Sequence, residues 1–201
     1  MSFEGRRVSE PSALRALSHP LRLRLIELLQ QAGPLTATEA AAHVGSSPSN
    51  CSFHLRQLAK YGYVTEAEAR AGRNRPWRRV DPHVTVPVDE LDQAGREALP
   101  MLISAAAERY RMNVLNWHST RDSYSKAWRS ASGDAHRVLR LTVDELAHIR
   151  DSIASLIEPY LERTPADDGP DIVPIAWLLS AVPLSQPTSS DADLLRTPRS
   201  T

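Results

Sequence analysis

The chain has 201 residues, which suits one domain with appendages or two small domains. Hydrophobic residues make up 41% of the sequence, enough for a packed core, but no stretch approaches the roughly 18 apolar residues that cross a bilayer. The N-terminus lacks the apolar run of a secretory signal, and the one cysteine excludes an internal disulfide or a cysteine-rich metal site. These features predict a cytoplasmic protein that does not enter membranes.

The formal net charge is zero, but the charge is unevenly distributed along the chain. Residues 1–80 contain 12 Lys/Arg and 6 Asp/Glu, whereas residues 81–201 contain 12 Lys/Arg and 18 Asp/Glu. A basic N-terminal part joined to an acidic C-terminal part favours an anionic partner for the first part. Chance clustering of solvated charges is the alternative explanation.

Helical patterns fill most of the N-terminal part. After an expected flexible tail over residues 1–10, leucines recur at helical spacing, and prolines stand where a first helical turn tolerates them. Ser47 is placed to cap the last of these helices, Pro48 takes its first position and Gly62 provides its stop. The helices expected in chain order span residues 11–17, 20–31, 36–44 and 47–61.

Two short extended segments follow, residues 63–68 and 77–80, on either side of a tip at residues 71–75. Glycine and asparagine at the tip are turn formers, so the sequence predicts a β-hairpin over about residues 64–80.

The next stretch, residues 89–132, is expected to be mainly helical, with a kink or break at Pro100. Thr142 and Glu145 show the capping-box pattern at the start of a further helix that reaches Leu161. A broad apolar stripe on the first of these helical stretches is formed by Tyr110, Val114, Trp117, Tyr124 and Trp128.

Two apolar segments flank the second of these helices. Residues 136–141 and 172–182 are expected to pair as strands, giving a small αβ element. Residues 185–201 are rich in Ser, Thr, Pro and Asp, and we expect them to be a disordered tail.

The last three of these helices, over residues 20–31, 36–44 and 47–61, are followed by a basic hairpin. This is the arrangement of a winged helix-turn-helix. In this arrangement the last helix enters the DNA major groove and the hairpin contacts the adjoining backbone or minor groove. The small polar side chains at the start of the 47–61 helix fit that role, because bulky aliphatic side chains would hold a helix off the groove. The inward stripe of this helix is Cys51, Leu55 and Leu58.

The same region resembles the ArsR/SmtB-type winged-helix repressors over about residues 11–83. The resemblance is carried by the stretches ALSHPLRLRLIELL, LTATEAAAHVGSSPSNCSFHLRQLAKYGYV and EARAGRNRPWRRV. It implies a homodimeric regulator that binds double-stranded DNA. The positions that agree in order are Ala40-Ala41, Gly45, Ser47, Ser49, Ser52, His54-Leu55, Leu58 and Gly62-Tyr63-Val64.

The resemblance also implies which side chains face DNA. Phe53 stands where the family usually has a polar residue, which suggests contact with a thymine methyl group or weaker polar readout. Pro48 falls on the same outward side of the helix. The residues implied by matching position are Ser47, Ser49, Asn50, Ser52, Phe53 and Arg56.

Four arginines of the hairpin are candidate phosphate ligands, and a solubilising hairpin edge is the alternative. Side chains alternate along a strand, so Arg78 and Arg79 cannot both face the same way. The four are Arg73, Arg75, Arg78 and Arg79.

Other reactive side chains are expected to have structural roles. A lone cysteine on an apolar helix face, such as Cys51, usually packs, although a redox role is the alternative. His54 is expected to pack or cap. The cysteine pair of the metal-sensing relatives is absent, and His118 with Asp122, or His148 with its acidic neighbours, is a weak metal signal. No metal site, cofactor or catalytic residue is therefore predicted.

The sequence thus predicts a mainly α (α+β) fold with a winged helix-turn-helix domain over residues 11–88 and a C-terminal helical dimerisation region over residues 89–184. We expect a transcriptional repressor, and not an enzyme, that acts as a homodimer on a palindromic operator. The aromatic bulk beyond residue 100 forms the core of the dimerisation region or a pocket for an apolar small-molecule effector. A winged helix that binds protein in place of DNA is the alternative function.

Overall fold

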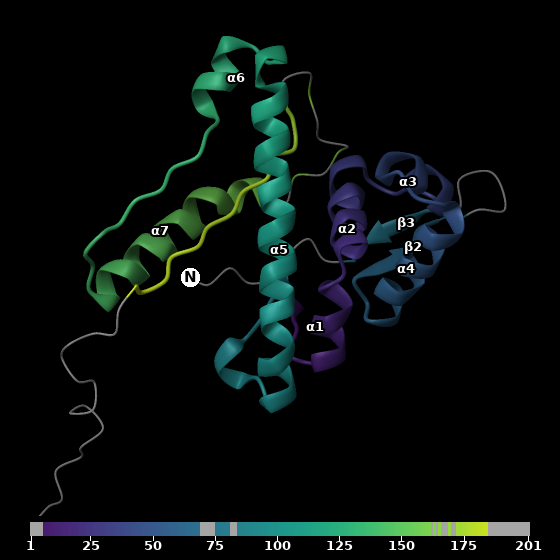
Figure 1. Cartoon of the computed structure of the whole chain (residues 1–201), viewed down its shortest axis with the longest axis horizontal. Helices are drawn as coiled ribbons and strands as arrows, with labels where there is room; N and C mark the ends of the chain where they lie inside the picture. Colours follow the sequence, from purple (N-terminus) through teal and green to yellow (C-terminus); the bar gives the residue numbers. More distant parts are fainter. Residues whose placement is uncertain are drawn as a thin grey trace, which may run out of the picture.

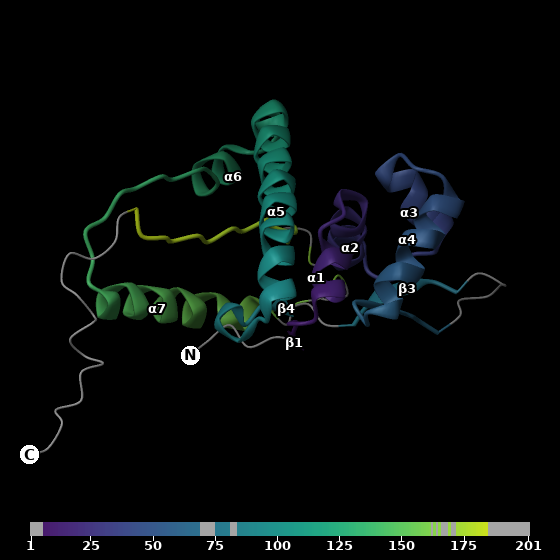
Figure 2. The ribbon, with the colours of Figure 1, turned by 60° about the horizontal axis from the view of Figure 1, so that its bottom comes forward.

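The structure is a computed structural model of the whole chain and describes residues 6–68, 75–80, 84–161, 163, 165, 169 and 172–184. Figures 1 and 2 show helices α1 to α4 and a hairpin on one side of the long helix α5, with α6 and α7 on the other side. The helices are α1 (Pro11–Leu17), α2 (Pro20–Ala32), α3 (Ala37–Val44), α4 (Pro48–Lys60), α5 (Gln93–Thr120), α6 (Lys126–Ala131) and α7 (Val143–Leu161). The strands are β1 (Arg6–Arg7), β2 (Val64–Glu66), β3 (Trp77–Arg79) and β4 (Val84–Thr85), and 3-10 turns lie at Val88–Glu90 (η1) and Arg121–Ser123 (η2).

The hydrophobic core lies where α1 to α4 meet. Leu14 of α1, Leu25 of α2 and Leu55 of α4 have no exposed surface, so the apolar stripes of these helices converge on one centre. Leu91, just before α5, and Ala98, in its first turns, belong to the same cluster. Full burial stabilises each leucine side chain by about 1.5–3 kcal/mol, so this cluster supplies much of the stability of the fold.

Local signals fix both ends of α3 and so the start of its connection to α4. The Oγ1 of Thr36 accepts a hydrogen bond from the Glu39 N–H (3.2 Å), and the Glu39 carboxylate accepts one from the Thr36 N–H (2.7 Å). This reciprocal pair is a capping box that starts α3. Gly45 ends α3 with φ of 63°, a left-handed conformation that favours glycine. The turn between the two helices is therefore short and defined.

The hairpin predicted after α4 is confirmed on both strands. β2 and β3 pair antiparallel, with Val64 opposite Arg79 and Glu66 opposite Trp77. Leu35, just before α3, adds backbone hydrogen bonds to Trp77 in both directions (3.0 and 2.7 Å). These bonds fix the base of the hairpin to the helical bundle; the tip at residues 69–74 lies outside the described residues.

The expectation of a flexible tail over residues 1–10 is wrong for residues 6–8. β1 pairs in parallel with β4, and Val8 is buried in the core cluster. Arg6 lies over the ring of Tyr63 at 4.8 Å and donates a hydrogen bond to the carbonyl of Tyr61, the C-cap of α4. The segment is ordered by contacts with residues more than fifty positions away, which leave no local sequence pattern.

The long helix α5 is continuous through Pro100, so the predicted break does not occur there. Proline removes one helical hydrogen bond, but packing can outweigh that cost. The first turns of α5 pack on α1 and bury Gly95 and Ala98 before the proline, and Leu102 packs against the core after it, so the helix is held on both sides of this position. Beyond Thr120 the helix gives way to η2 and the short α6.

The C-terminal part is helical but open. The capping box predicted at Thr142 and Glu145 is present, with the Thr142 N–H donating to the Glu145 carboxylate (2.8 Å) at the start of α7. Residues 136–141 and 172–182 do not form the predicted strands. Strands need a paired backbone and a covered apolar face. Here both segments stay exposed: Val138 and Trp177 each keep 67% of their accessible surface.

The predicted fold class is confirmed: a winged helix-turn-helix unit precedes a helical C-terminal region, with little strand structure. Among the described residues, no helix has both the length and the hydropathy that crossing a bilayer requires.

Candidate nucleic-acid interface

The start of α4 is a cluster of small polar side chains that cap one another. The Oγ of Ser47 accepts a hydrogen bond from the Asn50 N–H (3.2 Å) and lies 3.0 Å from the Oγ of Ser49. The amide of Asn50 donates to the Oγ of Ser46 (3.0 Å). These bonds order the exposed helix tip, and the remaining N–H groups of the first turn give it a partial positive charge.

Helix α4 has one buried side and one exposed side. Cys51, Leu55 and Leu58 have no exposed surface, which confirms the inward stripe predicted from their spacing. Ser49 and Arg56 are exposed and Ser52 is half-buried between them. These three residues are three and four positions apart, so they follow one another along a single face.

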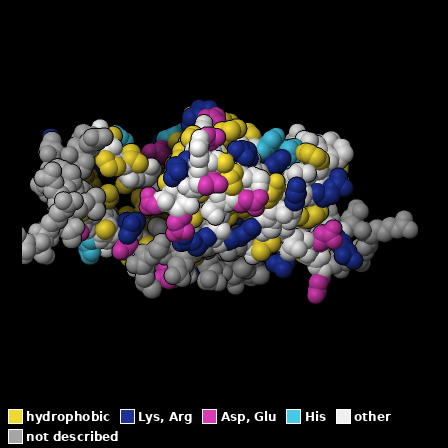
Figure 3. All heavy atoms as spheres, turned by 90° about the horizontal axis from the view of Figure 1, so that it is seen from below, with side chains coloured by type: hydrophobic (Ala, Val, Ile, Leu, Met, Phe, Trp, Pro, Cys, Tyr) yellow, Lys and Arg dark blue, Asp and Glu magenta, His cyan; other side chains and the backbone are white. Residues whose placement is uncertain are grey.

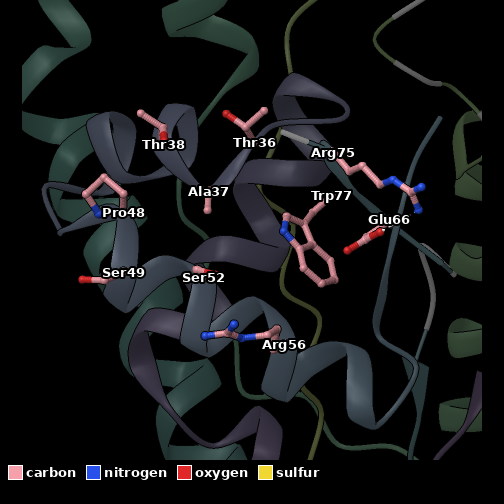
Figure 4. Close-up of a pocket in the computed structure, with 10 residues that line it drawn as sticks. All are labelled: Thr36, Ala37, Thr38, Pro48, Ser49, Ser52, Arg56, Glu66, Arg75 and Trp77. Carbon is pink, nitrogen blue, oxygen red and sulfur yellow. Dashed lines mark hydrogen bonds and ion pairs between the residues drawn. The ribbon is translucent and has the colours of Figure 1, made fainter. Parts of the chain in front are cut away.

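An open groove of about 580 Å³ joins this face of α4 to the hairpin (Figure 4). The N-terminal turn of α3 borders it on one side, and Trp77 with Arg75 borders it on the other. Residues more than twenty positions apart in sequence thus share one hollow surface. The lining residues are Thr36, Ala37, Thr38, Pro48, Ser49, Ser52, Arg56, Glu66, Arg75 and Trp77.

The hairpin arginines differ in their surroundings. Arg75 is exposed and forms an ion pair with Glu66 at 3.2 Å, so its charge is partly neutralised. Arg78 is exposed, whereas Arg79 turns the other way and donates a hydrogen bond to Gln30 of α2. The alternation predicted for Arg78 and Arg79 is therefore observed. Arg73 lies outside the described residues.

Two arginines that the sequence analysis did not single out hold the helices together. Arg24 of α2 donates to the carbonyls of Val44 (2.8 Å) and His43 (3.2 Å), which end α3. Arg22 donates to the carbonyl of Ala16 (3.0 Å). Part of the basic surplus of residues 1–80 therefore has a structural role. The sequence offers only a weak local signal for this structural role, because basic side chains near a helix C-terminus can bond its last carbonyls.

Two histidine rings, one at the N-cap of α2 and one on α4, pack against each other. The rings of His19 and His54 are 4.3 Å apart, and His54 Nδ1 accepts a hydrogen bond from Arg22 Nε (3.2 Å). Burial, followed by the charges of His19 and Arg22, lowers the pKa of His54. Burial likewise raises the pKa of the Cys51 thiol, which keeps it in its less reactive protonated form. Both residues pack as the sequence analysis expected.

The pairing of His118 with Asp122, one of the two weak metal signals, is not seen in the structure. His118 contacts Asp134 (2.8 Å between Nε2 and Oδ2), and not the Asp122 suggested by helical spacing. Within the described residues, no group of three or more His, Cys, Asp and Glu side chains has an arrangement that could hold a metal ion.

The surface around α4 carries exposed positive charges. Figure 3 shows several Lys and Arg side chains over the end of the molecule that holds α3, α4 and the hairpin, with a few acidic side chains among them. Exposed cations, a helix tip with free N–H groups and a hollow between helix and hairpin are features that suit binding of a polyanion.

Comparison with known proteins points to the same region. A family described as a helix-turn-helix domain matches residues 17–66. The chain is 38% identical over 79 residues to the HTH-type transcriptional regulator NmtR of Mycobacterium tuberculosis, a match that covers 39% of this chain and 63% of that relative. The match thus spans less than two thirds of the curated relative.

Two solved structures show likeness as well. A possible transcriptional regulator for arsenical resistance is 32% identical, with 50% of this chain and 92% of that chain covered and a TM-score of 0.31. ZitR of Lactococcus lactis is 14% identical, with 72% and 83% covered and a TM-score of 0.31. Because both TM-scores are low, the assignment of this region to a family rests on the sequence matches and on the local geometry. On those grounds, residues 17–66 form an ArsR-type helix-turn-helix domain.

Proposed function

We propose that this protein is a sequence-specific, DNA-binding transcriptional regulator, and that it acts as a repressor. The observation that carries the proposal is the groove shared by α4 and the hairpin. It places Ser49, Ser52 and Arg56 on the same surface as Arg75. The name of the relative from M. tuberculosis, a transcriptional regulator, supports the same function.

The residues divide into two roles. The exposed face of α4 would enter the major groove, where hydroxyl, amide and guanidinium groups pair with base edges. Within the described residues, Arg56 makes no hydrogen bond or ion pair, so its guanidinium is available for guanine. The hairpin would contact the sugar-phosphate backbone through Arg75 and Arg78, with Arg73 as a further candidate. Base contacts specify and phosphate contacts position.

We further propose that two copies act together. On α5, Met101, Met112 and Leu115 are exposed by 60%, 46% and 48%. Their spacing of 11 and 14 residues keeps them within roughly 60° of one another around the helix. An apolar stripe of this kind marks an association surface. A two-fold dimer would place two α4 helices on a palindromic operator with half-sites about 34 Å apart.

A small apolar molecule is the proposed controlling ligand. The support is the exposed apolar surface of α7 and the extended segment after it, including Leu156 (72% exposed) and Trp177 (67%). Binding there would stabilise the C-terminal region and shift its melting temperature. Thermal-shift screening with hydrophobic compounds tests this, and a full screen without a shift would contradict it.

The experiment for DNA binding starts with capture of genomic duplexes by the full-length chain. Affinities for the captured operator and a scrambled duplex are then measured by fluorescence anisotropy. Arg56→Ala should weaken operator binding by about 1–3 kcal/mol and leave scrambled binding nearly unchanged. Arg75→Ala should weaken both evenly and reduce the salt slope by about 1.

The matched control is Arg150→Ala, since Arg150 is an exposed arginine of α7, on the far side of α5 (Figure 1). It should leave both affinities unchanged. Equal losses for Arg56→Ala on operator and scrambled duplex would contradict base reading by α4. No preference for any duplex would overturn the proposal and favour the protein-binding alternative.

A further inference from the structure

One side chain on the outer face of α4 is chemically unlike its neighbours. Across residues 6–68, which the structure describes throughout, Phe53 is the one large hydrophobic side chain that remains exposed, by 49%. It lies one turn after Ser49 and one turn before Arg56, so it shares their face. A single exposed aromatic residue is ordinary in itself, so its role depends on how the ring is held and what lies beside it.

The ring of Phe53 is supported from behind. It meets the ring of His54 edge to face, with centroids 5.1 Å apart and an interplanar angle of 78°. His54 is only 6% exposed and is held by the His19 ring and by the hydrogen bond from Arg22. His19, His54 and Arg22 together form a platform that holds the exposed Phe53 ring in place before any ligand binds. Less conformational entropy is then lost when the ring makes a contact.

The chemistry of the ring limits what it can recognise. A phenyl ring has no hydrogen-bond donor or acceptor, so it cannot pair with the polar edges of the bases. The major groove offers one apolar group on its floor, the 5-methyl of thymine. A pre-positioned aromatic ring between polar readers of the same helix face has the chemistry to contact that methyl.

We propose that Phe53 is a specificity-determining residue that contacts the 5-methyl group of one thymine in each half-site. The proposal rests on the proposed function, in which α4 enters the major groove. It assigns to the His19–His54–Arg22 platform the role of positioning the Phe53 ring.

The test replaces the methyl while keeping every hydrogen-bonding group of the base. Thymines of the captured operator are changed one at a time to deoxyuridine, and the affinity of the full chain is measured by anisotropy. At one position per half-site the wild type should lose about fourfold, and about fifteenfold when both half-sites are changed. Elsewhere the substitution should have little effect.

Two variants make the assignment specific. Phe53→Ala should bind the thymine operator as weakly as the wild type binds the deoxyuridine operator, and should no longer distinguish the two. Arg56→Ala should bind more weakly but still distinguish them. Thermal unfolding of Phe53→Ala should match the wild type, because the side chain is half-exposed and outside the core.

The outcomes separate this inference from the function on which it rests. Specific operator binding that ignores every methyl, or full discrimination retained by Phe53→Ala, overturns the inference alone. Equal binding of operator and scrambled duplex by the wild type overturns both. Loss of discrimination in Phe53→Ala together with its retention in Arg56→Ala supports the inference.

Discussion

The two halves of the molecule differ in how they bury their apolar side chains. Residues 8–98 contain the whole connected core, with leucines of α1, α2 and α4 sealed from solvent. Among the described residues after Ala98, Ala154 alone is buried, and large side chains such as Leu156 and Trp177 remain open. The comparison teaches that the helix-turn-helix unit is held by its own packing, whereas the described part of the C-terminal region leaves most of its large apolar side chains exposed.

The largest expected effect is on the stability of the first half. Leu55→Ala should lower the free energy of unfolding by about 2–5 kcal/mol, because it leaves a cavity where no surface is exposed. Leu156→Ala, at an exposed position of α7, should change the unfolding of the helix-turn-helix unit by less than about 0.5 kcal/mol. Urea denaturation followed by circular dichroism measures both. Similar losses of unfolding free energy in the two variants would contradict the proposed difference in packing between the two halves.

The next effect is on association through the second half. Met112→Lys should raise the dissociation constant of the dimer by about tenfold or more, because it places a charge in the apolar stripe of α5. Ile103→Lys is the matched control: Ile103 is also exposed on α5 but lies on the opposite side from Met101. Analytical ultracentrifugation gives both constants. A dimer weakened only by the control would place the interface on the other side of the helix.

A pH effect should be confined to the first half. Folding lowers the pKa of His54 and of His19, chiefly through burial. The unfolded chain therefore binds more protons than the folded one as pH falls below about 6.5, and stability is lost in that window. His54→Gln should flatten this loss between pH 7.5 and 5.5, as measured by urea denaturation. An unchanged pH profile in the variant would show that His54 is not the group responsible.

The smallest effect concerns the ion pair on the hairpin. Glu66→Gln removes an acidic group from the groove and frees Arg75 for phosphate. Affinity for both operator and scrambled duplex should rise by about threefold, with the gain fading at high salt. Glu68→Gln is a control on the same strand end that does not line the groove. A loss of affinity in Glu66→Gln would mean that Glu66 holds Arg75 in its binding position.

Local patterns predicted much of the first half. The cap at Ser47, the stop at Gly62 and the spacing of Cys51, Leu55 and Leu58 each act within a few residues, so the sequence contains the full signal. The outward position of Ser49, Ser52 and Arg56 on α4 was likewise predicted from helical spacing, whereas their assignment to DNA came from the family resemblance. That prediction needed no knowledge of tertiary packing.

Long-range pairings were not predictable in this way. Arg6 with Tyr61, and Glu27 of α2 with Arg109 of α5, join residues 55 and 82 positions apart. No periodicity connects such partners. The wrong strand prediction for residues 136–141 has a related cause, because apolar composition alone does not provide the paired neighbour that a strand requires.

The central claim is that α4 and the hairpin bind the same DNA duplex at the same time. Hydroxyl-radical and guanine-methylation footprints of the full chain on its captured operator test this most directly. We expect protected major-groove guanines in two half-sites about one turn apart, flanked by protected backbone, with Arg75→Ala losing only the flanking protection. Footprints without major-groove protection, or flanking protection unaffected by Arg75→Ala, would contradict the claim.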